Sequence, residues 1–332
     1  MTDGGLRGDS CDSAHHKGTK AQRTICSQCS ERAIISQRYS GLHLCQDHFI
    51  QDFERRVADT VQKNNMVRDG ERIVVAVSGG KDSTALLFCL SRILAKRDVE
   101  LVAVTVDEGI AGYRDDTIVA AKAIAEKLGI EQHIVSFREE YGYELDEMVP
   151  GKKVAPCTYC GVFRKSALNR AAKRMGADKV ATGHNQDDEA QTIMMNYLKG
   201  DIERLMRFRP WRAQKGLVPR IKPLREMPEK EIALYCMVNQ VFTESRECPY
   251  ANLSLRADVR DMMNCLESQF PGTKHSTVEG FEKIVAKAQG SYAQMELAPC
   301  RQCGEPCVKE LCKACELLEI LKNRVEFAPF SR

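Results

Sequence analysis

Two glycines, a lysine, an aspartate and two serines stand together at residues 78–83, in the run Ser-Gly-Gly-Lys-Asp-Ser. Glycine lets a backbone approach phosphate oxygens closely, and the start of a helix offers free N–H groups and a positive dipole end. Lys81 adds a mobile cation, and Ser78 and Ser83 add hydroxyls. The run lacks the spacing of a Walker A loop and of the Gly-x-Gly-x-x-Gly motif. It is a candidate phosphate-binding loop of another kind, and an ordinary strand-to-helix turn is the alternative.

A second polar run, residues 183–189, reads Gly-His-Asn-Gln-Asp-Asp-Glu. Acidic residues are common in the first turn of a helix because they offset the helix dipole. Asp187 and Asp188 have this ordinary interpretation. Beside a phosphate-binding loop, however, two adjacent carboxylates could also hold Mg²⁺ or accept a proton. The residues alone leave both interpretations open.

Most of the 15 cysteines stand in Cys-x-x-Cys or Cys-x-x-His pairs, a spacing that favours metal sites over disulfides. Two pairs near each end of the chain predict a closed, tetrahedral zinc site with a structural role, and a disulfide or a chance cluster is the alternative. The expected ligands are Cys26, Cys29, Cys45 and His48 for the first site, and Cys300, Cys303, Cys312 and Cys315 for the second. Cys307 offers a competing ligand at the second site.

A further pair, Cys157 and Cys160, stands in the middle of the chain, and Cys248 follows far downstream with a proline after it. Three kinds of site compete for these residues: a redox or persulfide pair, another zinc site, or an iron–sulfur cluster held by three cysteines. Three thiolates would leave one iron of a [4Fe–4S] cube open to hydrosulfide. The cysteines themselves do not choose among these sites.

The elements that must position these groups alternate between strand and helix. Apolar runs predict strands at 73–77, 100–106, 132–137 and 179–182, and helical periodicity predicts helices at 49–64, 81–93, 115–128, 163–175 and 186–198. Such alternation is typical of a parallel, doubly wound α/β sheet, which binds ligands at the carboxyl ends of its strands. Ser78, Asp107 and Gly183 stand at those ends. Cys157 and Cys160 are expected between the third strand and the next helix.

Residues 199–230 form a strongly basic segment that also holds Phe208 and the only tryptophan, Trp211. Arginine with interleaved aromatic residues suits phosphate contacts and base stacking, and a solvated charged surface is the alternative. The candidate RNA-binding residues are Arg204, Arg207, Arg209, Arg212, Lys215 and Arg220. Helices are expected at 229–239 and, with a break at 271–272, at 256–288.

The composition, with 43% hydrophobic and 29% charged residues in 332, is that of a globular protein, and a net charge of +3 is too small to indicate nucleic acid by itself. Because no apolar segment of membrane-spanning length is present, we expect a cytoplasmic protein with reduced thiols. The expected parts are a disordered tail (1–23), an N-terminal zinc finger (24–50), a catalytic domain (51–230), a helical RNA-binding region (231–295) and a C-terminal zinc ribbon (296–332).

The run at residues 78–83 resembles the PP-loop of the ATP pyrophosphatases, a Rossmann-like family that cleaves ATP between its α- and β-phosphates. The resemblance implies that the loop holds the departing pyrophosphate while a carbonyl oxygen of the substrate is adenylated. It implies an ATP site made by Ala76, Val77, Ser78, Gly79, Gly80, Lys81, Asp82, Ser83, Asp107, Gly183 and His184, with Lys81 in a catalytic role.

The order of the cysteine pairs from Cys26 to Cys315, together with that loop, resembles the TtuA/NcsA-type tRNA 2-thiouridine synthetases. The resemblance implies ATP-dependent 2-thiolation of uridine in tRNA, with AMP and pyrophosphate released. It implies a [4Fe–4S] cluster on Cys157, Cys160 and Cys248 as sulfur carrier, two structural zinc ions, and Mg²⁺ with ATP. It further implies a catalytic lysine, best matched by Lys165 with Arg164 as the neighbouring candidate, and a catalytic aspartate at Asp187 or Asp188.

The same resemblance implies a homodimer and a sulfur donor that is either sulfide or a ubiquitin-like thiocarboxylate protein. Two rival functions remain. One is 2-thiolation of cytidine, whose enzymes share the loop and an internal Cys-x-x-Cys pair but generally lack zinc modules. The other is a non-catalytic, zinc-bearing RNA-binding protein, which an intact Lys81 and intact aspartates disfavour.

Overall fold

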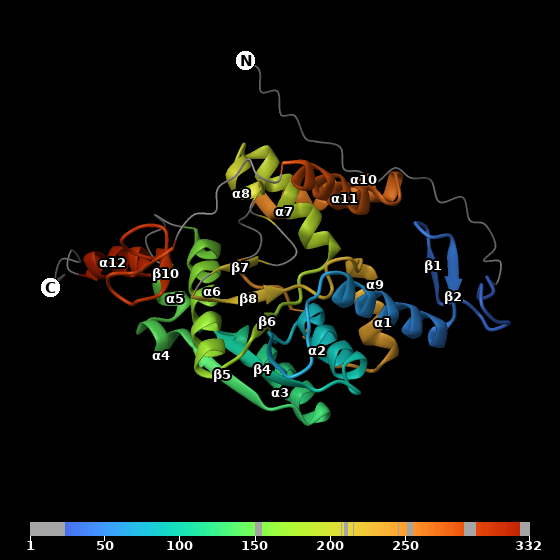
Figure 1. Cartoon of the computed structure of the whole chain (residues 1–332), viewed down its shortest axis with the longest axis horizontal. Coiled ribbons are helices and arrows are strands. Elements are labelled where there is room, and N and C mark those ends of the chain that lie inside the picture. Colours follow the sequence, from blue (N-terminus) through green and yellow to red (C-terminus); the bar gives the residue numbers. More distant parts are fainter. Residues whose placement is uncertain are drawn as a thin grey trace, which may run out of the picture.

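The computed structural model describes residues 24–149, 155–206, 208, 212–214, 216–244, 246–250, 255–288 and 297–325. The expected disordered tail, residues 1–23, lies outside the described residues. A six-stranded sheet in the order β5-β4-β3-β6-β8-β7 forms the centre of the molecule (Figure 1). Its strands are β3 (Glu71–Ala76), β4 (Val99–Asp107), β5 (Gln132–Ser136), β6 (Lys179–Ala181), β7 (Arg212–Gln214) and β8 (Leu217–Ile221).

Strands β3, β4, β5, β6 and β8 run parallel, and β7 pairs with β8 in the antiparallel direction. The chain builds outward from β3 through β4 to β5 and then crosses back to β6 on the other side of β3. The strand order therefore reverses between β3 and β6. Open α/β sheets bind their ligands at such a switch point, outside the carboxyl ends of the strands. The predicted doubly wound α/β class is confirmed.

Both faces of the sheet are buried, which explains why β3 is a continuous run of β-branched residues. Successive side chains of a strand point to opposite faces. Ile73 and Val75 accordingly belong to one hydrophobic core, and Val74 belongs to the other. The first core includes α1 (Gln46–Lys63), α2 (Lys81–Ile93), α3 (Arg114–Leu128) and α9 (Glu229–Val238), and the second includes α4 (Phe137–Tyr141), α5 (Leu145–Met148) and α6 (Pro156–Arg174).

A separate helical unit lies beside the sheet (Figure 1). Its members are α7 (Gln186–Leu198), α8 (Ile202–Met206), α10 (Leu255–Gln269) and α11 (Thr273–Lys287), which share a third hydrophobic core. Because α7 begins just after the carboxyl end of β6, this unit is joined directly to the switch point. The predicted break at residues 271–272 separates α10 from α11.

Two small cysteine-bearing modules lie at opposite ends of the molecule (Figure 1). The N-terminal module is a hairpin of β1 (Ile35–Gln37) and β2 (Leu42–Leu44), and it leads into α1. The C-terminal module consists of β9 (Ala298–Pro299), β10 (Pro306–Cys307) and α12 (Lys313–Val325), and it packs on α6. Neither module interrupts the sheet, so both leave the switch point open.

Two sequence-based expectations about the elements are wrong. The helix expected from residue 163 begins at Pro156, because proline at the first helical position is preset for the helix and lacks only an N–H that would be unpaired there. Cys157 and Cys160 therefore lie on α6 and not in a loop before it. Strand β8 was not predicted, since its five residues include a proline and an arginine. Within the described parts of the chain, no helix is long and apolar enough to cross a membrane.

Candidate active site

In the loop between β3 and α2, the backbone geometry requires glycine at position 79 but not at position 80. Gly79 has φ +87°, and a Cβ atom there would lie 1.9 Å from the Thr117 backbone oxygen. A side chain is therefore excluded twice, by conformation and by space. Gly80 has φ −77° and is the N-cap of α2, where a Cβ would meet nothing closer than 3.7 Å. Of the two loop glycines, only Gly79 therefore uses a positive φ.

Lys81 is held by carboxylates at the start of α2. Its Nζ lies 2.6 Å from Glu229 Oε1 and 3.1 Å from Asp82 Oδ2. Burial opposes the ammonium charge, but the charges of Asp82 and Glu229 outweigh it and raise the pKa of Lys81 above its ordinary value. Lys81 is therefore always positively charged. Phosphate oxygens of an incoming ligand can replace these carboxylates as its partners.

The residues after β6 touch the loop directly. A Cβ on Gly183 would lie 2.9 Å from both Asp82 C and Ser83 N, so only glycine allows this approach. Asn185 caps α7 in a capping box with Asp188, and its Nδ2 donates to Asp82 Oδ1 at 3.0 Å. The loop and the acidic helix start are thus one assembly.

The two adjacent aspartates of α7 have different surroundings. Asp187 is buried, pairs with Lys274 through Oδ1, and accepts the Glu229 N–H through Oδ2 at 2.9 Å. Asp188 points into the cavity described below, where burial raises its pKa to about 6 against the opposing charge of Arg256, whose Nη1 lies 3.5 Å from Oδ1. Both carboxylate oxygens of Asp187 are occupied by short contacts within the fold, whereas Asp188 faces the cavity with only the longer contacts to Asn185 and Arg256.

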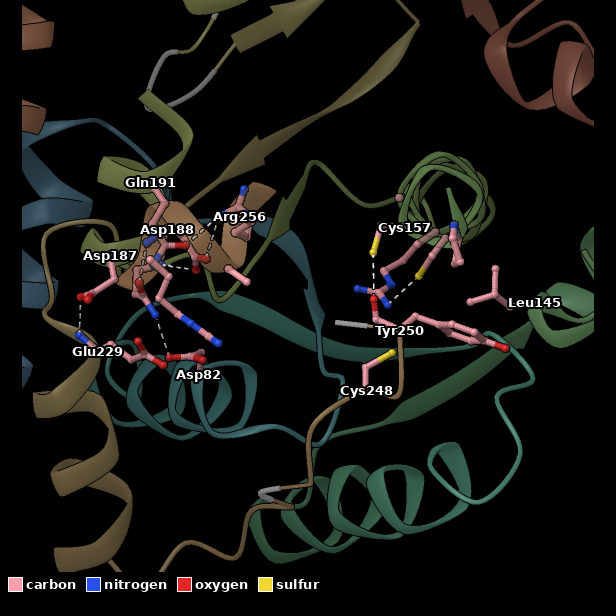
Figure 2. Close-up of a pocket in the computed structure, with 17 residues that line it drawn as sticks. Asp82, Leu145, Cys157, Asp187, Asp188, Gln191, Glu229, Cys248, Tyr250 and Arg256 are labelled. Atoms are coloured by element: carbon pink, nitrogen blue, oxygen red, sulfur yellow. Dashed lines mark hydrogen bonds and ion pairs between the residues drawn. The ribbon is translucent and has the colours of Figure 1, made fainter. Parts of the chain in front are cut away.

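One open cavity of about 380 Å³ joins the loop, the start of α7 and the three central cysteines. Figure 2 shows Asp82, Glu229, Asp187 and Asp188 at one end of it and Cys157, Cys248 and Tyr250 at the other. Its lining comprises Asp82, Leu145, Pro156, Cys157, Cys160, Gly161, Arg164, Asn185, Asp187, Asp188, Gln191, Glu229, Cys248, Tyr250, Arg256, Ala257 and Arg260. Residues more than 90 positions apart in the chain, such as Cys157 and Tyr250, make its walls, with the thiol 3.7 Å from the carbonyl oxygen.

The three cavity cysteines fit a group larger than a single ion. Cys157 and Cys160 are one helical turn apart on α6, and Cys248 reaches the same cavity from the segment before Tyr250. Among the described residues, only the two terminal sets of cysteine and histidine gather their ligand atoms within 4.8 Å of one another. Thiolates are soft donors that suit iron–sulfur clusters. Cys157, Cys160 and Cys248 thus present three soft donors to one cavity, the donor type that an iron–sulfur cluster uses.

Arg164, and not Lys165, faces these cysteines. Arg164 Nη2 lies 3.0 Å from Cys160 Sγ, and Arg164 Nε donates to Glu108 Oε1 at 2.6 Å. Burial raises the pKa of the Cys160 thiol to about 11 even with the guanidinium beside it. Lys165 does not line the cavity; its carbonyl accepts from Arg220 Nη2 at 2.8 Å, and burial together with Arg220 lowers its pKa.

The remaining candidates for the ATP site lie at the carboxyl ends of the strands, and not all of them face the cavity. Val77 is buried and its carbonyl accepts from Thr105 Oγ1 at 2.8 Å, and Ala76 is half-buried beside it. Asp107 Oδ1 accepts the Gly109 N–H at 2.9 Å. His184 bonds Thr182 through Nδ1, and burial with the nearby cations lowers its pKa to about 3, so it is neutral.

The candidate RNA-binding residues are only partly described. Arg204 is exposed on α8, and Arg220 lies on β8 beside Lys165. Arg207, Arg209 and Lys215 lie outside the described residues, and of Arg212 only the backbone in β7 is described.

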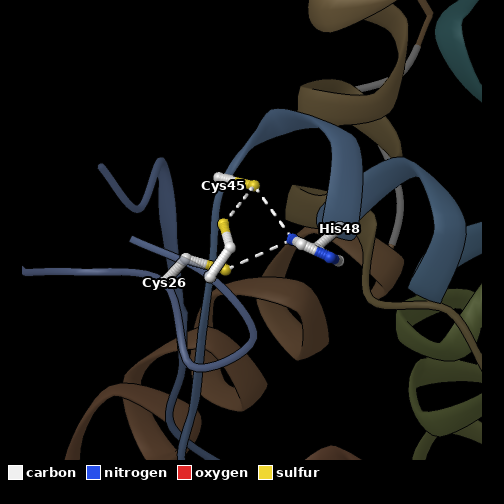
Figure 3. Close-up of side chains that lie close together, drawn as sticks. Cys26, Cys45 and His48 are labelled. Atoms are coloured by element: carbon white, nitrogen blue, oxygen red, sulfur yellow. Dashed lines mark hydrogen bonds between the residues drawn. The ribbon is translucent and has the colours of Figure 1, made fainter. Parts of the chain in front are cut away.

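The N-terminal set, Cys26, Cys29, Cys45 and His48, has the spacing of a zinc site (Figure 3). Thiolates around zinc at about 2.3 Å in a tetrahedron lie about 3.8 Å apart. The Cys29 and Cys45 Sγ atoms are 3.7 Å apart, and His48 Nδ1 lies 3.2 Å from Cys45 Sγ. Although desolvation opposes it, backbone N–H groups, that of Cys45 foremost, lower the pKa of Cys26 to about 6. The thiolate that zinc requires is thus prepared.

The C-terminal set, Cys300, Cys303, Cys312 and Cys315, repeats this design. The Cys303 and Cys312 Sγ atoms are 3.6 Å apart, and the Cys312 N–H donates to Cys300 Sγ at 3.3 Å. Against desolvation, backbone N–H groups lower the pKa of Cys300 to about 6. The competing Cys307 donates instead to the Lys309 carbonyl at 2.9 Å.

Besides Arg256 and Arg260 of the cavity lining, four charged residues that support the site were not found from the sequence. Glu108 and Arg114 connect the loop to Arg164, Glu229 holds Lys81, and Lys274 holds Asp187. Glu108 directly follows Asp107 at a strand end, which is a usable signal. The other three look like ordinary helix-surface charges, and only the tertiary contacts reveal them.

Two family profiles match the chain. The profile described as "PP-loop domain" matches residues 49–263, and that described as "2-thiouridine synthetase TtuA, N-terminal LIM domain" matches residues 25–50. The tRNA 2-thiolation protein NcsA of Haloferax volcanii is 37% identical over 317 residues, which cover 90% of this chain and 99% of that protein. Cytoplasmic tRNA 2-thiolation protein 1 of Chlamydomonas reinhardtii is 38% identical over 305 residues, which cover 90% of this chain and 85% of that protein.

A solved structure has a similar fold throughout. The U34-tRNA thiolase NcsA from Methanococcus maripaludis, solved with its [4Fe–4S] cluster, superposes with a TM-score of 0.79 at 35% identity. The superposition covers 90% of this chain and 96% of that one.

Proposed function

Because the chain belongs to the PP-loop family, and within it to the NcsA-type tRNA 2-thiolation proteins, we propose that it is an ATP-dependent tRNA sulfurtransferase. In this proposal the enzyme adenylates the C2 oxygen of a uridine and replaces it with sulfur, releasing AMP and pyrophosphate. The observation that carries the proposal is the single cavity that is lined both by Asp82 of the PP-loop and by the three central cysteines. A nucleotide-activated base and a sulfur source can meet only if both sites share one space.

The loop residues activate the oxygen. A bare carbonyl oxygen is a very poor leaving group, so it must first take an adenylyl group from ATP. Lys81 and the N–H groups of Gly79 and Gly80 stabilise the negative charge that develops on the departing pyrophosphate. Binding requires Lys81 to exchange Glu229 for phosphate oxygens. Mg²⁺ that accompanies ATP would find oxygen ligands in Asp82 and Glu229 of the same cavity.

Asp188 is the proposed base, and Asp187 positions it. A carboxylate with a pKa of about 6 is ionised at neutral pH and is still basic enough to accept a proton from the reacting uridine or hydrosulfide. Asp187 fixes the start of α7 by pairing with Lys274 and by accepting the Glu229 N–H. The two roles that the sequence left open are thus divided between the neighbours.

Cys157, Cys160 and Cys248 would hold the [4Fe–4S] cluster, which when bound supplies the sulfur-carrying site. Arg164 places a guanidinium at this end of the cavity, where it can bond Cys160 and meet negative charge on the adenylated substrate. We therefore move the proposed catalytic cation from Lys165 to Arg164. Lys165 and Arg220 belong instead to a basic surface suited to RNA phosphates.

The proposal assigns structural zinc to both terminal cysteine sets and tRNA as the substrate. The wobble uridine is the proposed target, because the M. maripaludis relative is a U34-tRNA thiolase. The sulfur donor is sulfide or a ubiquitin-like thiocarboxylate protein, and the working form is a cytoplasmic homodimer. We retain as a proposal the division predicted from the sequence: a disordered tail (1–23), an N-terminal zinc finger (24–50), a catalytic domain (51–230), a helical tRNA-binding region (231–295) and a C-terminal zinc ribbon (296–332).

Anaerobic reconstitution tests the proposal. The protein with its cluster is incubated with tRNA, ATP and sulfide, and the tRNA nucleosides are analysed by mass spectrometry. We expect 2-thiouridine at the wobble position, with one AMP released per sulfur transferred. The appearance of 2-thiocytidine would replace the uridine assignment, and tRNA binding without thiolation would favour a non-catalytic RNA-binding protein.

A further inference from the structure

A chain of alternating charges runs from the PP-loop to the central cysteines. Arg114, at the start of α3, donates through Nη1 to the Ser78 carbonyl at 3.0 Å. Its Nε lies 2.7 Å from Glu108 Oε2. Glu108 Oε1 in turn accepts from Arg164 Nε at 2.6 Å, and Arg164 Nη2 lies 3.0 Å from Cys160 Sγ. These contacts link the two ends of the cavity through protein atoms alone.

The interior members of this chain are deeply buried. The side chain of Glu108 is 2% exposed and that of Arg114 is 5% exposed, whereas Arg164, at the cavity, is 50% exposed. Burying a carboxylate is costly unless it is paired, and here two guanidiniums pair it. Two arginines and one glutamate leave one excess positive charge. Arg164 carries this charge at the cavity, where its Nη2 lies beside Cys160 Sγ.

We infer that Glu108 is a positioning residue for sulfur transfer. It holds Arg164 in hydrogen-bonding contact with Cys160. A guanidinium half exposed at a cavity has many rotamers, and Glu108 selects the one in which one nitrogen faces the carboxylate and another faces the sulfur. Arg114 pairs with the other carboxylate oxygen of Glu108 and also donates to the Ser78 carbonyl, so it joins Glu108 to the loop. The inference rests on the proposed function: its activity readout needs tRNA thiolation, whereas its spectroscopic readout needs only the bound cluster.

The test compares Glu108→Gln, Arg164→Gln, Arg164→Lys and the Glu108→Gln/Arg164→Gln double variant in the full-length protein with its cluster. Glu140→Gln is the matched control, because Glu140 also pairs with two arginines of α6, Arg170 and Arg174, without lining the cavity. Two measurements are made: the kinetics of thiolation, as kcat and the KM for ATP, and the electron paramagnetic resonance spectrum of the reduced cluster.

We expect Glu108→Gln and Arg164→Gln each to lower kcat about 10- to 100-fold, the range typical of partners that orient metal ligands. The double variant should be no slower than the single ones, since both remove the same contact. Both single variants should alter the cluster spectrum in the same way, and Glu140→Gln should alter neither quantity. Arg164→Lys should behave like Arg164→Gln, because an ammonium keeps the charge but not the fork that bridges Glu108 and Cys160.

Losses that multiply in the double variant, or a Glu108→Gln protein with the wild-type spectrum and kcat, would overturn the inference. If Glu108→Gln does not fold, full activity of Arg164→Lys overturns it, because charge alone would then suffice. Failure of the wild-type protein to thiolate tRNA counts against the proposed function instead, and the spectra still decide the role of Glu108.

Discussion

Replacing Asp188 by asparagine should remove the proton acceptor from the cavity while leaving the fold intact. The carboxylate and the amide have nearly the same shape, and Asn at this position can still accept the Asn185 N–H of the capping box. Loss of a general base typically costs about 10²- to 10⁴-fold in rate. We expect a fall of this size in kcat/KM for tRNA thiolation.

The pH dependence gives a sharper signature than the rate alone. Burial raises the pKa of Asp188 from its ordinary 3.8 to about 6, and a base acts only when ionised. In the wild-type protein kcat/KM should therefore fall about tenfold for each pH unit below that value. The asparagine variant should lack this acid limb. The same limb should persist in Asp187→Asn, because Asp187 does not supply the base.

The stability of the fold should change with pH in the direction opposite to the activity. Because the folded pKa of Asp188 lies above the unfolded one, the folded state loses stability as pH rises through the window from 3.8 to about 6. The whole shift corresponds to about 3 kcal/mol, and the 35% exposure of the side chain reduces this to on the order of 1–2 kcal/mol. Asp188→Asn should therefore be more stable than wild type at pH 7 and equal to it below pH 4.

The assay is thiolation of a tRNA transcript between pH 5 and 8, paired with urea unfolding at pH 4 and 7. An asparagine variant that keeps the wild-type rate, or that keeps the acid limb, would refute the assignment of Asp188 as base. A variant that is slow but also less stable at pH 7 would show that the carboxylate supports the fold instead.

Four further outcomes are expected. Lys81→Ala should abolish ATP-dependent AMP formation, measured by chromatography, because the cation facing the departing pyrophosphate is lost. Cys248→Ala should abolish iron–sulfur absorbance while both zinc ions remain in metal analysis; a persisting cluster spectrum would remove this ligand. Lys274→Met should lower the free energy of unfolding by about 3–5 kcal/mol in urea titrations, because Asp187 would stay buried without its partner. Cys45→Ser should remove one of two zinc ions, and retention of both would contradict the N-terminal site.

Features encoded by neighbouring residues could be predicted from the sequence. A β-branched run, adjacent glycines and a helix start at Lys81 are local signals, and together they indicated β3, the loop and α2 correctly. Periodicity placed α7 at residues 186–198 for the same reason. Each cysteine set at a terminus is likewise compact in the chain, so its spacing alone indicated how the ligands gather.

Contacts between residues that are far apart in the chain could not be predicted from their local sequence. Lys81 and Glu229 are 148 positions apart, and nothing about a glutamate at a helix start indicates which lysine it will contact. Strand β8 owes its place to pairing with β6 and not to its own residues, of which only Ile221 is buried. Tertiary context overrides such weak local preferences. The spacing of the cysteines did not indicate that Cys248 approaches the other two; the family resemblance implied it, and the folded cavity brings the three together.

The contact of Arg164 with Cys160 was within reach of the sequence, and one misplaced helix start hid it. Residues four apart lie on the same face of a helix, and residues five apart do not. With α6 beginning at Pro156, Cys160 and Arg164 share a face, and Lys165 is turned by a further 100° or so toward Arg220. Placing the cysteine pair in a loop removed this periodicity from consideration. A Cys-x-x-Cys pair preceded by proline should therefore be tested for a helix start before its neighbours are assigned roles.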